Sequence, residues 1–160
     1  MILLNNQIVQ PAEFPESQFK TGLSIYEVIR IFKGHAIFLK DNLLRLRNSI
    51  KKSNIDIDIH QLRIEDKLNR LIALEHIEEG NIKYVLHLTK DKWDEYIYQI
   101  PHHYPTEENY KNGIDTITCE AIRLNPEVKY INNDLRTLTD RLLQELSLIH
   151  ISEPTRPEPI

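Results

Sequence analysis

The sequence predicts an α+β fold, and two observations lead to this class. Strand-like runs rich in β-branched and aromatic residues occur in neighbouring pairs, and two segments with helical periodicity separate the second pair from the third. Strands and helices that come in runs, rather than in strict alternation, are typical of α+β domains. A chain of 160 residues can hold one such domain, or one domain and part of another.

The first part of the chain supplies four of the predicted strands. Residues 2–9, ILLNNQIV, predict a β-hairpin that turns at Asn5-Asn6. Residues 10–20 contain two prolines and predict a loop. Residues 23–39 predict a second hairpin that turns at Lys33-Gly34 and returns from Ala36 to Leu39.

Two helices are predicted after these hairpins. Asp41 is placed to cap a helix that runs to about Ser53, because the apolar residues that follow recur on one helical face. A second helix is predicted from about His60 to Ile77, and Gly80 is expected to stop it.

The rest of the chain predicts three more strands and one helix. Residues 81–89 and 94–101 indicate two strands joined by a turn, and residues 113–122 indicate a third. Residues 132–146 predict an amphipathic helix, with Asn133 or Asp134 as its cap.

The composition excludes several classes of protein. The net charge of -4 gives no basic surface for nucleic acid or for an anionic membrane. A single cysteine, Cys119, excludes internal disulfides and fits a reducing compartment. No apolar run approaches the roughly 20 residues that span a bilayer, and the first residues do not resemble a signal peptide. These features predict a soluble cytoplasmic protein.

Several residues that suggest chemistry have a simpler interpretation. His102-His103 would point to opposite sides of a strand, and no other histidine or cysteine stands at a supporting spacing, so no metal site is predicted. Cys119 lies in an apolar stretch and is interpreted as a buried structural thiol. Glycine-rich phosphate loops and nucleophile-elbow motifs do not occur in the sequence.

Two basic residues are candidates for a functional role. Arg45 lies between two leucines of the first predicted helix, where it either reaches solvent from an apolar face or binds an anion such as a phosphate. Lys129 lies between Val128 and Tyr130, where it is either solvated or partly buried as a nucleophile towards a carbonyl group.

Taken together, two motifs resemble signatures of the class IV, or fold-type IV, pyridoxal-phosphate aminotransferases. This family includes branched-chain and D-amino-acid aminotransferases and aminodeoxychorismate lyase, and the resemblance covers residues 1 to about 145. The first motif lies in GLSIYEVIRIFKGHAIFLKDNLLRLRNSIKKSNI, and the second is an arginine followed by K-x-x-N. The matching residues are Tyr26-Glu27, Lys33-Gly34, Phe38-Leu39, Arg45-Leu46 and Ser49 in the first motif, and Arg123, Lys129 and Asn132 in the second.

The resemblance implies a set of roles. Lys129 would form the Schiff base with pyridoxal 5'-phosphate and move the proton at the substrate α-carbon, Arg45 would hold the cofactor phosphate, and Tyr26 would line the substrate pocket. It also implies the small N-terminal domain of the fold-type IV architecture plus the start of the C-terminal domain. The full-length parent is expected to be a homodimer that acts on amino acids and 2-oxo acids, with the cofactor between two domains.

Three departures from the family pattern leave the substrate open. Asn42 stands where a histidine is usual, and Gly22-Leu23-Ser24 replaces Gly-Asp-Gly. Lys90-Asp91 stands where some members have an arginine and a glycine for the substrate carboxylate. These differences argue against the D-amino-acid subtype. Amino transfer, including transfer from a branched-chain amino acid, stays open beside elimination of pyruvate by a lyase and an inactive incomplete domain.

The predicted domain organisation ends in an unusual tail. We expect an N-terminal domain over residues 1–122, a linker with the lysine and the start of a second domain over 123–145, and a non-native tail over 146–160. The tail begins LSLIHISEPTR, which matches the translation of a transposase-type sequencing adapter. The alternative is a natural proline-rich tail. Because family members are longer, the chain is expected to be an N-terminal fragment without the carboxylate that faces the pyridine nitrogen.

Overall fold

The computed structural model describes residues 1–11, 14, 16–89, 92–101, 105–114, 118, 120, 126–131, 138–139, 141–143 and 145. The chain forms two compact units. Met1–His103 with Leu124–Ile131 make up the first unit, and Tyr104–Arg123 with Asn132–Ile160 make up the second. Lys129 therefore packs with the first unit, while the predicted domain boundaries stay a prediction.

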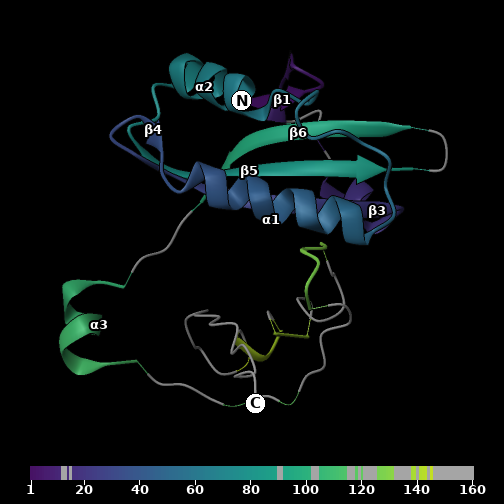
Figure 1. Cartoon of the computed structure of the whole chain (residues 1–160). Coiled ribbons are helices and arrows are strands. Elements are labelled where there is room, and N and C mark those ends of the chain that lie inside the picture. Colours follow the sequence, from purple (N-terminus) through teal and green to yellow (C-terminus); the bar gives the residue numbers. More distant parts are fainter. Residues whose placement is uncertain are drawn as a thin grey trace. The chain divides into compact units, whose positions relative to one another are not determined.

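The first unit is built on an antiparallel sheet whose strand order is β2-β1-β6-β5-β3-β4 (Figure 1). The longest ladder joins β3 to β5 and places Tyr26 opposite Val85 and Val28 opposite Lys83. The strands are β1 (Ile2–Leu4), β2 (Gln7–Val9), β3 (Leu23–Phe32), β4 (His35–Ala36), β5 (Glu79–Leu88) and β6 (Trp93–Ile100). This arrangement confirms the predicted α+β class and the two predicted hairpins.

The turns of both hairpins use left-handed backbone conformations. Asn5 and Asn6 have φ values of 48° and 67°, as a two-residue turn between twisted strands requires. Lys33 and Gly34 have φ values of 50° and 73°. The second hairpin has a shorter return strand than predicted, because β4 ends at Ala36 and a helix begins three residues later.

Helix α1 (Leu39–Lys52) begins two residues before the predicted cap. Its N-cap is Phe38, which has a left-handed conformation and no side-chain hydrogen bond to the first turn. Asp41 lies in that first turn instead. A carboxylate there still favours the helix through the partial positive charge of the N-terminal amides.

Helix α2 (Ile64–Glu75) is shorter at both ends than the prediction of about His60 to Ile77. Arg63 and His76 have left-handed conformations that bound the helix. The expectation that Gly80 stops the helix was wrong, because Gly80 already belongs to β5. Helical periodicity continued beyond the true ends because Leu62 and Ile77 are also buried in the core.

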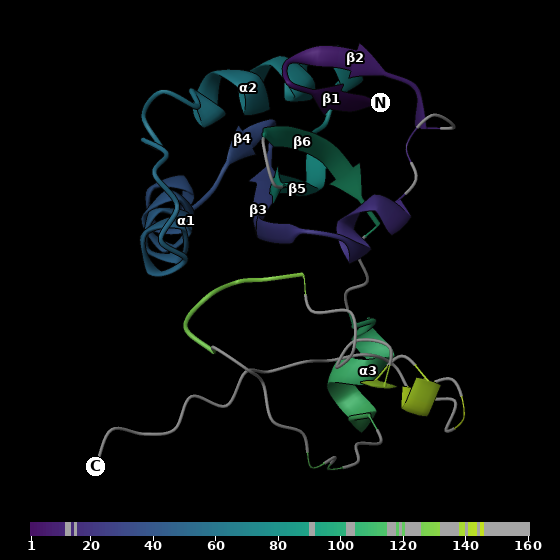
Figure 2. The same cartoon turned by 90° about the vertical axis from the view of Figure 1, so that its right-hand side faces the viewer.

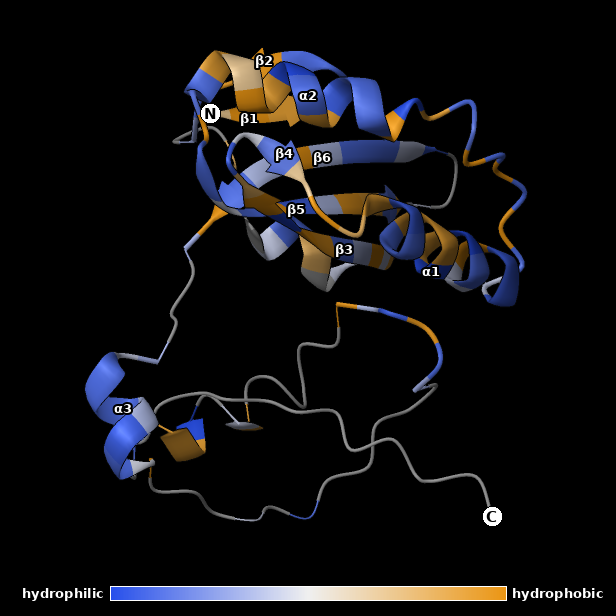
Figure 3. Cartoon of the chain, turned by 60° about the vertical axis from the view of Figure 1, so that its left-hand side comes forward, coloured by the Kyte–Doolittle hydropathy of each residue, from blue (hydrophilic) through white to orange (hydrophobic). Residues whose placement is uncertain are grey.

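Both helices cover the same face of the sheet, and the main core lies between them and the strands (Figure 2). Figure 3 shows hydrophobic and hydrophilic stretches interleaved along the two helices, as expected of amphipathic helices. The core includes Leu3, Ile25, Ile29, Ile31, Ile82, Tyr84, Leu86 and Ile97 from the strands and Leu46, Ile50, Leu68, Leu71 and Ile72 from the helices.

A smaller cluster lies on the other face of the sheet. It contains Val85, Tyr96 and Tyr98 from the strands together with Phe19. Phe19 comes from the 3-10 helix η2 (Glu16–Lys20), which forms inside the predicted loop. The Phe19 and Tyr96 rings meet edge to face, with their centroids 5.2 Å apart.

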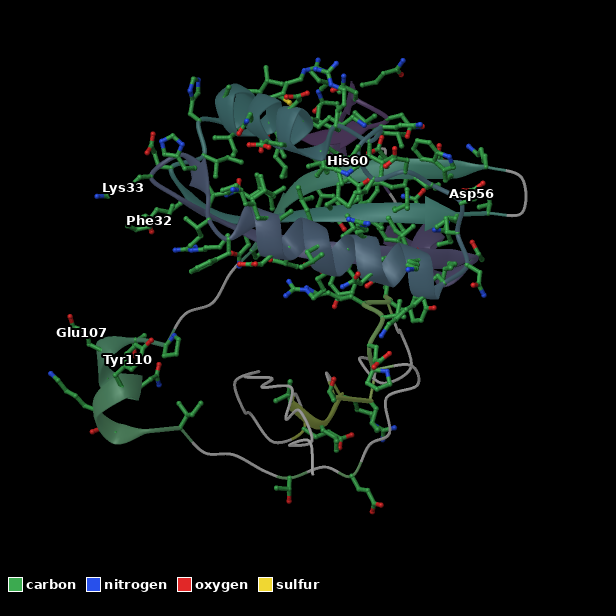
Figure 4. The ribbon with its side chains drawn as sticks, in the orientation of Figure 1. Phe32, Lys33, Asp56, His60, Glu107 and Tyr110 are labelled. Carbon is green, nitrogen blue, oxygen red and sulfur yellow. The ribbon has the colours of Figure 1, made fainter. Side chains whose placement is uncertain are left out.

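The described part of the second unit contains helix α3 (Glu107–Asn112), in a polar stretch for which no helix or strand was predicted. Thr106 and Asn109 form a reciprocal capping box at its start. Asparagine in place of the usual Glu or Gln made this signal hard to recognise. Figure 4 labels Glu107 and Tyr110 on this helix.

Some predictions concern residues outside this description. Residues 138–139, 141–143 and 145 are helical, in the region of the predicted last helix. Cys119, the His102-His103 pair, the tail and most of the strand predicted at 113–122 lie outside the described residues. No helix in the described part of the chain is long and apolar enough to span a membrane.

Candidate active site

A buried glutamate is the centre of the candidate site. Glu27 lies in the middle of β3 and is 1% exposed, in phase with Ile25 and Ile29 on the helix-facing side of the sheet. An ionised carboxylate in such surroundings is costly unless partners neutralise it and satisfy its oxygens.

Arg45 is the first partner of this carboxylate. It lies on α1, and its guanidinium donates from Nε to Glu27 Oε1 at 2.7 Å and from Nη2 to Oε2 at 2.6 Å. Nη2 also donates to Asn42 Oδ1 at 3.1 Å. The hydrogen bond to Glu27 raises the pKa of Arg45, while burial opposes the increase. The bidentate pair fixes the orientation of the arginine.

Lys129 is the second partner. Its Nζ lies 3.1 Å from Glu27 Oε2, the same oxygen that accepts from Arg45 Nη2. The ammonium group also lies over the Tyr26 ring, 5.1 Å from the centroid. The lysine side chain is 24% exposed and that of Arg45 is 48% exposed, so both cations remain accessible to a ligand.

The segment that carries Lys129 is held against the edge of β3. Tyr26 N–H donates to the Lys129 carbonyl at 3.0 Å, and Ile131 N–H donates to the Ser24 carbonyl at 2.9 Å. Tyr130 forms a β-bridge with Ile25. Because β4 pairs only with the last residues of β3, the start of β3 is open to this segment.

Helix α1 holds the same segment from its other side. Lys129 N–H approaches Ser49 Oγ at 3.4 Å, and the Tyr130 hydroxyl lies 3.0 Å from Ser53 Oγ. Lys52 forms an ion pair with Glu127. One helix therefore supplies Arg45 and also contacts the segment of Lys129, which fixes the two cations relative to each other.

The structure brings together all three residues singled out from the sequence. Tyr26, Arg45 and Lys129 lie around one carboxylate, while Arg123 and Asn132 of the second motif lie outside the described residues. Their functional roles stay predictions. Glu27 belongs to the first motif but had no predicted role, although an acidic residue in phase with buried isoleucines of a strand indicates a buried carboxylate.

The geometry suits an aldehyde that carries a phosphate. The contacts of Arg45 among the described residues use Nε and Nη2, which leaves Nη1 for an outside anion. The Lys129 amine lies beside it and can attack a carbonyl once it loses its proton. Asn42, which replaces the usual histidine, contacts Arg45 directly. The residues present therefore fit pyridoxal phosphate.

A pocket of about 560 Å³ lies apart from these side chains. It is lined by residues of β1, β2, η2, β5 and β6, among them Gln18, His87 and Asp94, and not by Tyr26, Arg45 or Lys129. Because two partly exposed cations meet at a buried carboxylate, Glu27 and its partners are a better guide to the site here than cavity size.

Comparisons with solved structures define the fold first. The structure resembles 4-amino-4-deoxychorismate lyase from Pseudomonas aeruginosa with a TM-score of 0.64 at 16% identity, over 89% of this chain and 56% of that one. It also resembles the PLP-bound form of a hypothetical aminotransferase from Mycobacterium tuberculosis with a TM-score of 0.67 at 15% identity, over 92% and 59% of the two chains. These likenesses establish the fold.

Sequence comparison then establishes the family. Residues 24–148 match the family described as amino-transferase class IV, so the chain belongs to it. The chain is 24% identical to the D-alanine aminotransferase of Bacillus licheniformis, over an alignment that covers 91% of this chain and 56% of that protein. The chain thus spans about half the length of the curated relatives it matches. At this identity, the prediction against the D-amino-acid subtype stays a prediction.

Proposed function

We propose that this chain is the N-terminal part of a pyridoxal-phosphate-dependent aminotransferase that moves an amino group between an amino acid and a 2-oxo acid. One observation carries the proposal: Lys129 and Arg45, on segments far apart in sequence, both contact the buried carboxylate of Glu27. Membership of the class IV family supports it. A homodimer in the cytoplasm, with the cofactor between two domains, belongs to the same proposal.

Each side chain has a separate task in this proposal. Arg45 binds the cofactor phosphate, because its planar guanidinium suits a tetrahedral anion and Glu27 already fixes its orientation. Lys129 would hold the cofactor through its side-chain amine, and the same amine, once the substrate amine had freed it, would move the proton at the substrate α-carbon. Tyr26 lines the substrate pocket beside that amine. When bound, pyridoxal phosphate supplies the electron sink for the substrate carbon.

Glu27 supports both cations. Before the cofactor binds, its carboxylate offsets the repulsion between an arginine and a lysine that contact the same oxygen. It therefore keeps the phosphate anchor and the reactive amine close together. Covalent capture would release Lys129 from this ion pair and leave the bidentate pair with Arg45 intact.

Amino transfer is favoured over elimination. The curated relatives at 24% identity are D-alanine aminotransferases from Bacillus licheniformis and Listeria monocytogenes. The lyase from Pseudomonas aeruginosa is similar in fold alone. Incubation with an amino acid and a 2-oxo acid distinguishes the two activities, since exchange of the amino group supports transfer and release of pyruvate supports a lyase. D- and L-alanine and a branched-chain donor extend the test to the substrate.

The Lys129 assignment has a direct chemical test. We expect pyridoxal phosphate followed by borohydride reduction to label the peptide that contains Lys129, and peptide mass spectrometry detects this label. Lys129→Ala should abolish it, whereas Lys51→Ala, which removes an exposed lysine of α1, should leave it unchanged. Equal labelling of many lysines in the unaltered chain would contradict the assignment.

The Arg45 assignment predicts a loss of affinity. Arg45→Ala should weaken pyridoxal phosphate binding by roughly tenfold or more, because charge-assisted hydrogen bonds contribute about 1.5–3 kcal/mol. A fluorescence or absorbance titration measures the affinity. Arg47→Ala removes an exposed arginine from the same helix and is the matched control. Equal affinities in the two variants would reject the phosphate role.

The extent of the gene decides how the activity assay is made. Reading the coding DNA across codons 144–157 shows whether residues 146–160 belong to it. If an adapter sequence is found, the assay requires the recovered parent gene. If no adapter sequence is found, the chain itself is assayed. A lack of activity would then support the remaining alternative, an incomplete domain without catalysis of its own.

A further inference from the structure

A second lysine lies close to the candidate site on β5. Lys83 is half-buried, and its ammonium group lies over two tyrosine rings. Its Nζ is 5.3 Å from the centroid of Tyr26 and 5.9 Å from that of Tyr98. Tyr98 is its direct cross-strand partner on β6, and Val28 is its partner on β3. Lys83 therefore occupies the middle of the sheet face that lies opposite the helices.

The Tyr26 ring connects this lysine to the reactive amine. Lys129 Nζ lies 5.1 Å from the same centroid that Lys83 Nζ approaches at 5.3 Å. The Tyr26 ring is therefore common to the surroundings of both ammonium groups. The two lysines differ in their surroundings, because Lys129 contacts the carboxylate of Glu27 and Lys83 lies among aromatic rings.

The surroundings of Lys83 suit it to bind an anion. Each cation–π contact contributes about 0.5–1 kcal/mol at an exposed site and more where water is excluded. Two such contacts restrict the side chain, so less conformational entropy is lost when an anion binds. Partial burial also lowers the local dielectric and strengthens attraction to a negative charge. A surface lysine with a flexible stem has none of these advantages.

We propose that Lys83 binds a carboxylate of the substrate, so that the site takes amino acids and 2-oxo acids through an ammonium group on β5. This inference rests on the proposed function, because it takes Lys129 to be the amine that meets the substrate. The carboxylate is either the one beside the reacting carbon or a second one at the far end of a dicarboxylic substrate. Tyr26 then separates two tasks, with covalent chemistry at Lys129 and charge recognition at Lys83.

The test compares two lysines that lie at different places in the fold, each with its ammonium group over an aromatic ring. Lys83→Met removes the charge at the proposed site. Lys33→Met is the matched control, since Lys33 Nζ lies 5.4 Å over the Phe32 ring at the tip of the β3–β4 hairpin (Figure 4). Pyruvate and 2-oxoglutarate are the probes, and titration followed by NMR or calorimetry gives their affinities for the full chain.

The expected result is a loss of about tenfold in probe affinity for Lys83→Met, the effect of removing one partly buried charge partner. Lys33→Met should bind as the unaltered chain does. An equal loss for both probes assigns the carboxylate beside the reacting carbon, and a loss for 2-oxoglutarate alone assigns the distal one. Unchanged affinity in Lys83→Met, or no binding of either probe to the unaltered chain, overturns the inference.

Two further measurements keep the result unambiguous. Lys83→Arg retains the charge and should retain probe binding, which separates loss of charge from loss of folding if Lys83→Met is unstable. Borohydride labelling of Lys129 in each variant tests the proposed function independently. If labelling persists and carboxylate affinity is unchanged, only the role of Lys83 fails. If the unaltered chain is not labelled, the proposed function fails.

Discussion

Two buried glutamates on the same face of the sheet make a useful comparison. Glu27 of β3 is 1% exposed and Glu95 of β6 is 3% exposed. Each is in an ion pair with a lysine, and each has a second side-chain donor. From burial and pairing alone, the two carboxylates look equivalent.

Their partners differ in access to solvent. Glu95 pairs with Lys67, whose side chain is 15% exposed, and accepts from the hydroxyl of the fully buried Tyr84 at 2.9 Å. Glu27 pairs with the more exposed Arg45 and Lys129. The side chains around Glu95 come from β5, β6 and α2 and are largely buried, whereas the cations of Glu27 reach the surface.

This difference separates a structural role from a functional one. A closed ion pair cannot meet a ligand without local unfolding, so its effect is to hold α2 on the sheet. An open pair places charged groups where a ligand can contact them while one buried carboxylate orients them. The exposure of the partner side chains therefore says more about the role of a buried carboxylate than the burial of the carboxylate itself.

The largest expected effect tests the closed cluster. Glu95→Gln should lower the free energy of unfolding by about 3 kcal/mol, because it leaves the partly buried Lys67 ammonium without its counter-charge. Urea denaturation followed by circular dichroism measures the loss. Tyr84→Phe removes only a hydrogen bond and should cost about 1 kcal/mol. Equal losses in the two variants would show that the ion pair is not the main contribution.

A smaller effect on stability is expected at the open cluster. Glu27→Gln should lower the free energy of unfolding by about 1–2 kcal/mol, since water can still solvate the two cations. The same denaturation experiment gives this value. Unlike Glu95→Gln, it should also reduce labelling of Lys129 by pyridoxal phosphate. A variant that loses stability and keeps full labelling would place Glu27 with Glu95 as a structural residue.

The smallest effect concerns a buried group that carries no charge at neutral pH. Burial lowers the pKa of His87, although Asp94 opposes the shift, and His87 Nδ1 lies 2.8 Å from Ser24 Oγ. Above the ordinary value of 6.5 both states are neutral. As pH falls below it, the unfolded chain takes up a proton that the folded chain does not, so stability falls towards pH 5.

Thermal unfolding between pH 7 and pH 5 measures this loss. His87→Gln should flatten the pH dependence over that interval. His60→Gln removes an exposed histidine, labelled in Figure 4, and should leave the slope unchanged. If the pH dependence of stability disappears in the His60 variant and persists in the His87 variant, the assignment to His87 is wrong.

The local sequence predicted most of the helices and strands, but few of the residues at which they begin and end. The alternation of isoleucines along β3 and the Asn5-Asn6 turn are determined by neighbouring residues, and both were predicted correctly. The start of α1 was predicted at Asp41, but the chain enters the helix directly after the short β4, and Phe38 is the cap. Gly22 shows the same limit, because only the fold brings it so near β5 that an added Cβ would lie 2.3 Å from the Leu88 carbonyl oxygen.

The sequence by itself determined the class of fold, most of the strands and helices, and the candidate residues Tyr26, Arg45 and Lys129, because motif spacing and hydrophobic periodicity are properties of the chain. Only the tertiary structure decided that Glu27 contacts both Arg45 and Lys129. It also decided that Lys83 and Lys129 lie over the same ring, that of Tyr26. The physical reason is distance along the chain. Glu27 and Lys129 are 102 residues apart in sequence, and only the pairing of the lysine segment with the edge of β3 brings their charges within 3.1 Å.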